Sequence, residues 1–188
     1  TAGCAVNDRH EARVLLAILG ERWDEAERLQ RGRPVDPATY VTLCTTADVV
    51  ATVHATMFRA GRSDLLGADV TARLTKARAK VRVDNLLLLA RLDQALDLLL
   101  AAGVRPVALK GVDVLQRLYG SFDERSLDDV DLLVRRDQRD LAIATLEGAG
   151  FTGPAGAERT HWLRSSFELP MASPGPVAVA FEIHWSLG

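Results

Sequence analysis

One long run of helical periodicity, over residues 68–102, constrains the fold of this chain more than any other segment. Its apolar residues recur at steps of three, four or seven positions: Val70, Leu74, Ala77, Val81, Leu88, Leu92, Leu96 and Leu99. This spacing places them along the same side of a single long helix. Gly103 follows directly and is typical of a helix C-terminal cap. We interpret the apolar side of this helix as core rather than as a zipper for a partner chain.

The residues before the long helix are also helical in pattern. Asp36 precedes Pro37 in the order of an N-cap and a first helical position, and Gly61 ends a later helical segment. Shorter helices are predicted over residues 8–20, 21–30, 37–44 and 47–60. Residues 1–102 are therefore predicted to form a helical N-terminal region.

The periodicity changes after Gly103. Short apolar runs at 105–109 and 129–134 predict strands, as do the mixed segment 162–169 and the partly alternating segment 177–185. Helices are predicted between them, over residues 111–119 and 138–149. Residues 103–188 are therefore predicted to form a second domain, and the whole chain an α+β protein in which the helical region packs on a small mixed sheet with flanking helices.

Composition and charge exclude several classes of protein. The 188 residues are 48% hydrophobic and 26% charged with a net charge of −2, which is the balance of a globular domain rather than a disordered chain. No apolar run approaches the roughly 20 residues that span a bilayer, and no strong basic excess favours nucleic acid. Cys4 and Cys44 are far apart in the sequence and near no histidine cluster, so neither a disulfide framework nor a zinc site is predicted. We expect a cytoplasmic protein without a membrane partner.

Carboxylates gather between positions 123 and 131, with Arg125 as the single cation among them. The five are Asp123, Glu124, Asp128, Asp129 and Asp131. Because side chains alternate along a strand, Asp129 and Asp131 project from the same face, about 7 Å apart along the backbone. Such a pair is suited to a hard cation such as Mg²⁺ together with substrate phosphates, although a solvated strand end explains most Asp-x-Asp tripeptides.

A second feature lies upstream, where a predicted strand ends at Lys110 and Gly111 opens a helix. Backbone N–H groups at a helix N-terminus receive anions, which would place Lys110 beside phosphates. The alternative is an ordinary surface lysine.

Four ordered motifs together resemble a known family. They are Ala108-Leu-Lys-Gly-Val112, Leu118-Tyr-Gly120, Arg125-Ser-Leu-Asp-Asp-Val-Asp-Leu-Leu-Val134 and Glu182-Ile-His-Trp185. This set is similar to the uncharacterised nucleotidyltransferase family of the DNA polymerase β superfamily. The resemblance covers most of the chain, including the helical preface, and implies a nucleotidyltransferase-type sheet.

The resemblance implies roles for particular residues. Asp129 and Asp131 would bind metal with Glu182 as the third carboxylate, holding two Mg²⁺ ions, with Mn²⁺ as the other candidate. A nucleoside triphosphate would then transfer its nucleoside monophosphate to an acceptor hydroxyl and release pyrophosphate. Glu182 is a candidate to take the proton of the acceptor. The acceptor is expected to be a small molecule or a peptide or protein side chain.

Further residues are assigned by the same resemblance or by strand alternation. Lys110 and Gly111 stand where the wider superfamily has a Gly-Ser turn for the triphosphate. Arg125 is predicted either to contact a phosphate or to anchor Asp129. By alternation, His184 shares the face of Glu182, whereas Trp185 points into the core. His184 is a candidate to contact nucleotide or metal, and because Mg²⁺ prefers oxygen ligands, a role in positioning or hydrogen-bonding the nucleotide is favoured.

Two other functions remain open from the sequence. The chain is either a non-catalytic relative that keeps the fold as a binding or regulatory module, or a helical interaction domain whose functional part is residues 1–102. The first alternative predicts that the three carboxylates lie more than about 8 Å apart. His161 and Trp162 are candidates for a mobile rim over the base, or for a plain hairpin, and His54 for packing within a helix. Since family members continue past the strand of Glu182, we also expect a chain truncated at its C-terminus.

Overall fold

The computed structural model describes the backbone of residues 2–119 and 121–187, with side chains from Arg9 onward except at Gln116. The chain forms two compact units. Unit 1 comprises Thr1–Val83 and Ser121–Ser126, and unit 2 comprises Asp84–Gly120 and Leu127–Gly188. The boundary between compact units thus falls inside the long helix, whereas the domain boundary expected from the change of periodicity, at 102/103, stays a prediction.

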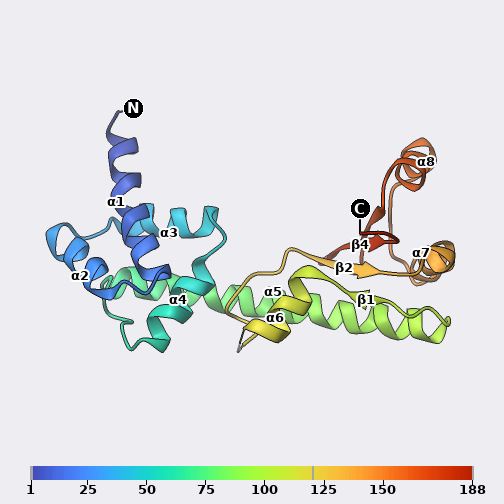
Figure 1. The fold of residues 1–188 in the computed structure, drawn as a ribbon, viewed down its shortest axis with the longest axis horizontal. Helices are drawn as coiled ribbons and strands as arrows, with labels where there is room; N and C mark the ends of the chain where they lie inside the picture. Colours follow the sequence, from blue (N-terminus) through green and yellow to red (C-terminus); the bar gives the residue numbers. More distant parts are fainter. Residues whose placement is uncertain (1, 120, 188) are drawn as a thin grey trace. The chain divides into compact units, whose positions relative to one another are not determined.

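Unit 1 is helical. Its helices are α1 (Ala2–Leu19), α2 (Trp23–Gly32), α3 (Pro37–Thr46), α4 (Val50–Arg59) and the first part of α5 (Ala68–Ala101) (Figure 1). The predicted start of α3 is confirmed, because the Asp36 carboxylate accepts a hydrogen bond from the backbone N–H of Thr39 at 2.8 Å and Pro37 is the first helical residue. Tyr40, Ile18 and Leu74 are among the fully buried residues of its core.

Unit 2 contains a four-stranded mixed sheet in the order β1-β2-β4-β3 (Figure 1). The strands are β1 (Val107–Ala108), β2 (Asp129–Leu133), β3 (Glu168–Ala172) and β4 (Ala180–His184). The central pair, β2 and β4, is parallel, and β1 and β3 are antiparallel to their neighbours. The helices are α6 (Lys110–Leu118), the 3₁₀ turn η1 (Arg136–Gln138), α7 (Arg139–Gly148) and α8 (Gly156–Ser165). The predicted α+β class with a small mixed sheet is therefore confirmed.

Alternation along the central strands separates core from site. Val130 and Leu132 of β2 and Phe181 and Ile183 of β4 are at most 1% exposed, and they share one hydrophobic core with residues of α5 and α7. That core includes Leu88, Leu92 and Leu99 of α5, and Ile143 and Leu146 of α7. The apolar side of the second part of α5 is thus core, as the periodicity predicted. The residues between these apolar positions project from the opposite face of the sheet.

The strand predicted over residues 162–169 is wrong except at its last two residues, Glu168 and Leu169, which begin β3. Residues 156–165 form helix α8, and strand β3 begins only at Glu168. None of the α8 residues is buried, and its sequence lacks the apolar periodicity by which a helix is recognised. His161 and Trp162 therefore lie on a helix, and the hairpin suggested for them is also wrong.

The last predicted strand is confirmed in part, because 177–185 is reduced to β4. Trp185, directly after β4, is 6% exposed and belongs to the core, as alternation predicted. Within the described residues no single helix has the length and apolarity to cross a membrane. Helices α3 and α4 pass that test only together, and they are bent by 112° at their break.

Candidate functional site

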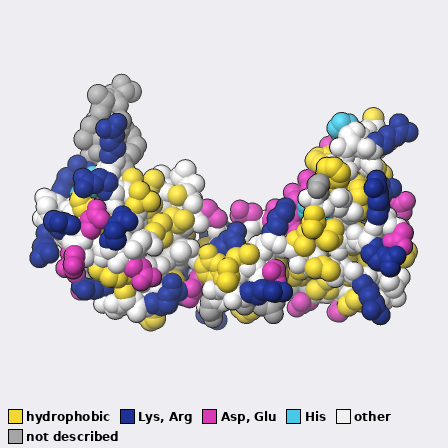
Figure 2. Space-filling view, in the orientation of Figure 1, with side chains coloured by type: hydrophobic (Ala, Val, Ile, Leu, Met, Phe, Trp, Pro, Cys, Tyr) yellow, Lys and Arg dark blue, Asp and Glu magenta, His cyan; other side chains and the backbone are white. Residues whose placement is uncertain are grey.

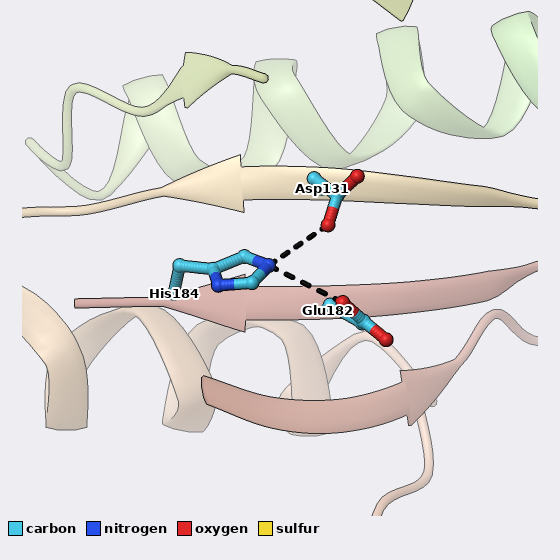
Figure 3. Close-up of side chains that lie close together, drawn as sticks. All are labelled: Asp131, Glu182 and His184. Carbon is cyan, nitrogen blue, oxygen red and sulfur yellow. Dashed lines mark hydrogen bonds and ion pairs between the residues drawn. The ribbon is translucent and has the colours of Figure 1, made fainter. Parts of the chain in front are cut away.

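Three side chains from the two parallel strands converge on one face of the sheet (Figure 3). Asp131 projects from β2, and Glu182 and His184 project from β4, where the register places Asp131 beside Glu182. The Nε2 atom of His184 lies 2.8 Å from Oδ1 of Asp131 and 3.3 Å from Oε2 of Glu182. One potential ligand atom from each residue lies within 4.8 Å of the others, which is compact enough for a shared metal ion.

Lys110 brings a cation to this cluster from the first residue of α6. Its ammonium donates a hydrogen bond to Oδ1 of Asp131 at 2.8 Å and lies 3.7 Å from Oε2 of Glu182. The preceding residue, Leu109, donates its backbone N–H to the Asp131 carbonyl at 3.0 Å, so the start of α6 is tied to β2. Lys110 has a φ of 47°, in the left-handed region that non-glycine residues seldom adopt. The side chain reaches the carboxylates from this strained backbone.

Glu168 is a further member of the site that the sequence did not indicate. It lies on β3 directly opposite His184, and its Oε2 atom is 3.3 Å from Nδ1 of that ring. Both ring nitrogens of His184 therefore face carboxylates. Only the pairing of β3 with β4 brings Glu168 here, and a single sequence carries no signal for that register.

Burial and neighbouring charges separate the acids of the site. Burial would raise the pKa of Asp131, but hydrogen bonds from Lys110, His184 and Glu182 outweigh it and lower this pKa. Burial, the hydrogen bond with Asp131 and nearby carboxylates together raise the pKa of Glu182. The hydrogen bond with Asp131 raises the pKa of Lys110. The site thus favours an ionised Asp131 and a Glu182 that holds its proton more tightly.

Asp129 lies two residues before Asp131 on the same face of β2. It is not among the three residues whose ligand atoms lie within 4.8 Å of one another. Burial and the charge of Asp131 raise its pKa, so the fold disfavours its ionised form. Asp129 therefore shares the strand face of Asp131 but lies outside the group of three close ligand atoms, and its ionised form is less favoured than that of Asp131.

Gly111 and Arg125, two other predicted site residues, have different surroundings. A Cβ atom on Gly111 would lie 3.1 Å from Cδ2 of Leu127, so the second position of α6 has little room for a side chain. Arg125 belongs to the segment Ser121–Ser126 of unit 1, whereas the carboxylates belong to unit 2. Its predicted contact with a phosphate or with Asp129 stays a prediction.

The segment Ser121–Ser126 is held within unit 1 by polar contacts. Arg78 donates a hydrogen bond to Oδ1 of Asp123 at 2.8 Å, and the hydroxyl of Thr52 donates to the carbonyl of Glu124 at 2.8 Å. Arg59 pairs with Glu124 as well. Of the five acidic residues between positions 123 and 131, Asp123 and Glu124 thus contact residues of helices in unit 1. Both acids therefore have ion-pair partners within unit 1.

His54 and Trp185 have structural surroundings. The half-buried ring of His54 contacts Thr75 and Arg78 within unit 1, where burial and then the Arg78 charge lower its pKa. The Arg139 guanidinium lies 5.0 Å from the centre of the Trp185 ring, which is a cation–π contact.

The fold and site define an α+β protein with a mixed sheet, whose central parallel strands present acidic side chains beside a helix N-terminus that carries a lysine. The model of the uncharacterised nucleotidyltransferase family matches residues 33–188, which is most of the chain. The chain belongs to this family, as its motifs predicted. No curated protein and no solved structure gives a significant match.

Proposed function

We propose that this protein is a metal-dependent nucleotidyltransferase, which transfers a nucleoside monophosphate from a nucleoside triphosphate to a hydroxyl acceptor and releases pyrophosphate. The observation that carries the proposal is the convergence of Asp131 and Glu182 from adjacent parallel strands, with Lys110 at the start of α6 in contact with both. A non-catalytic relative would be expected to have dispersed acids. The family membership supports the same class of reaction.

The residues present fit a divalent cation. Asp131 and Glu182 offer carboxylate oxygens, the ligands that Mg²⁺ prefers, and Asp129 offers another from the same strand face. In the proposed site these three acids hold two Mg²⁺ ions, or Mn²⁺ in their place. When bound, the ions neutralise charge on the triphosphate and lower the pKa of the acceptor hydroxyl.

The chain's own residues have separate roles in this proposal. Lys110 leaves Asp131 to bind a phosphate, which its exposed side chain permits because 61% of it is accessible to solvent. Gly111 lets the phosphates approach the N-terminus of α6. Glu182, whose pKa is raised, takes the acceptor proton. His184 is proposed to position the nucleotide, and Arg125 stays a separate candidate for nucleotide binding.

The proposed partners are a nucleoside triphosphate and a small-molecule or peptide or protein acceptor, in the cytoplasm. On the face drawn in Figure 2, Lys and Arg side chains are interspersed with Asp and Glu over both units. The charges on this face are thus mixed, and together with the net charge of −2 they support the proposal that nucleic acid is not the acceptor, because a phosphate backbone is bound by positive surface.

Calorimetric titration with ATP, GTP, CTP and UTP, each with and without Mg²⁺, tests the proposal. We expect Mg²⁺-dependent binding of at least one triphosphate, and its loss in the double variant Asp129→Ala/Asp131→Ala. A matched control removes two exposed carboxylates of the same unit, Asp128→Ala/Asp137→Ala, and is expected to bind as the wild type does.

Three outcomes contradict the proposal in different ways. Folded wild-type protein that binds no triphosphate favours the non-catalytic module. Binding that survives in Asp129→Ala/Asp131→Ala places the nucleotide elsewhere. Loss of binding in the control double variant shows that overall charge, not the strand acids, governs binding.

A further inference from the structure

Two side chains of the cluster contain nitrogen, and His184 is far more buried than Lys110. It is 6% exposed, and carboxylates from three strands surround its ring. Nε2 faces Asp131 of β2 and Glu182 of β4, at 2.8 and 3.3 Å, and Nδ1 faces Glu168 of β3 at 3.3 Å (Figure 3). The cross-strand register fixes this arrangement, since His184 pairs with Glu168 and lies two residues after Glu182.

The two sides of the ring are chemically different. On the Nε2 side, two carboxylates and the ring nitrogen present three donor atoms within 4.8 Å of one another. On the Nδ1 side, the Glu168 carboxylate lies at an ion-pair distance of 3.3 Å. A histidine that binds a metal through one nitrogen almost always donates the hydrogen of the other nitrogen to a carboxylate, a carbonyl or water. Glu168 is the carboxylate beside that other nitrogen.

We propose that His184 is itself a metal ligand through Nε2, together with Asp131 and Glu182, and that Glu168 is the positioning residue that orients the ring. The inference shares two carboxylates with the proposed function, and it gives His184 a metal-ligand role in place of the nucleotide-binding role proposed above. It changes the expected ion, because Mg²⁺ prefers oxygen ligands, whereas Mn²⁺ and later first-row ions bind imidazole readily. The site is therefore expected to prefer Mn²⁺ to Mg²⁺.

The Lys110 contact is consistent with such an ion. Lys110 Nζ and His184 Nε2 both lie 2.8 Å from the same oxygen, Oδ1 of Asp131, so this oxygen already faces one cation, the Lys110 ammonium, and one ring nitrogen. The Lys110 side chain is mostly exposed and leaves without unpacking any core residue, whereas His184 is enclosed and stays. A divalent ion that replaces the ammonium would meet a fixed ring nitrogen.

Electron paramagnetic resonance of Mn²⁺ bound to the full chain, without nucleotide, tests this inference. The loss of the free Mn²⁺ signal on titration gives the affinity, and electron spin echo modulation reports a directly bound ¹⁴N. We expect ¹⁴N modulation in the wild type and tighter binding of Mn²⁺ than of Mg²⁺ in competition. His184→Gln should abolish the modulation.

The role of Glu168 is tested by Glu168→Ala, for which a roughly 10–100-fold weaker Mn²⁺ affinity is expected. Glu168→Gln keeps an oxygen that accepts the Nδ1 hydrogen and should recover part of that loss. Glu158→Gln, at an exposed position on α8, is the matched control and should leave affinity and modulation unchanged. Circular dichroism checks that each variant is folded.

Mn²⁺ binding without ¹⁴N modulation in the wild type overturns the inference, as does the absence of Mn²⁺ binding at millimolar concentration. These wild-type results decide it even if His184→Gln does not fold. An unchanged affinity in Glu168→Ala refutes the positioning role. The proposed function fails separately, since nitrogen-ligated Mn²⁺ without triphosphate binding would contradict that function and leave this inference standing.

Discussion

Asp129 and Asp131 share a strand face, yet their neutralisation is expected to change stability in opposite directions. The fold favours the ionised form of Asp131, whose pKa is lowered, and disfavours that of Asp129, whose pKa is raised. In metal-free protein at pH 7 both are compared as single Asn variants, which keep side-chain shape and remove the charge. Asp131→Asn should destabilise the protein, and Asp129→Asn should stabilise it slightly.

The contacts of Asp131 set the size of its effect. The ionised Asp131 carboxylate is the charged group in its hydrogen bond with the buried His184, and such a bond contributes about 1.5–3 kcal/mol, whereas the exposed Lys110 adds only about 0–1 kcal/mol. We therefore expect Asp131→Asn to lower the free energy of unfolding by about 2–3 kcal/mol. Asp129→Asn removes repulsion from Asp131 at a half-buried position and should add between about 0 and 1 kcal/mol.

Thermal and urea unfolding in the presence of EDTA measure both effects. A loss of about 2 kcal/mol lowers Tm by roughly 4–8 °C for a chain of this size. Asp128→Asn is the control, because Asp128 is exposed and adjacent, and it should change stability by less than about 0.5 kcal/mol. Equal shifts of Asp129→Asn and Asp131→Asn in the same direction would refute the reasoning, since total charge alone would then explain them.

Three other predictions concern separate features. Hydrogen bonds from Ser121 and Arg78 outweigh burial and lower the pKa of Asp123, so its ionised form stabilises the fold above pH ~4 and this stability is lost as the pH falls below that; an acid titration of unfolding should show wild type and Asp123→Asn converging at low pH, and parallel curves would contradict this. Burial raises the pKa of the Cys44 thiol to about 12, so in Cys4→Ser protein a maleimide at pH 8 should label Cys44 only after denaturation. Because Lys110 has a positive φ, the free energy of unfolding of Lys110→Gly should exceed that of Lys110→Ala by about 1 kcal/mol, although both lose the ammonium. Lys110→Gly should therefore unfold at a higher urea concentration, and equal midpoints would show that the backbone is not strained there.

The sequence predicts those elements and site residues that depend on local patterns or on a motif. The cap of α3, the long helix α5 and strand β2 follow from periodicity and from Asp36, Pro37 and the apolar run after Asp128. Local pattern indicates Lys110 and Asp131, the family motif adds Glu182, and strand alternation places His184 beside it; the structure brings these four residues into contact. Their chemical roles remain proposals.

The pairing of strands that are distant in the chain cannot be predicted from this single sequence. Glu168 was missed because its place opposite His184 depends on the register of β3 with β4. The sequence does not indicate helix α8, because its residues 156–165 carry no apolar positions at helical spacing and none of them is buried. The five acids of 123–131 looked like one cluster, whereas Asp123 and Glu124 are paired with arginines of unit 1.

Because Ser121–Ser126 belongs to unit 1, this unit cannot be completed during synthesis, or isolated as a fragment, from its N-terminal stretch alone. The chain passes between the units after Val83, after Gly120 and again after Ser126, so unit 1 is assembled from two separate stretches of sequence. During synthesis, the ion pair between Arg78 and Asp123 cannot form until α6 and the residues after it have been translated. A fragment ending at residue 102 would lack that partner, and binding experiments on the helical region alone would test an incomplete fold.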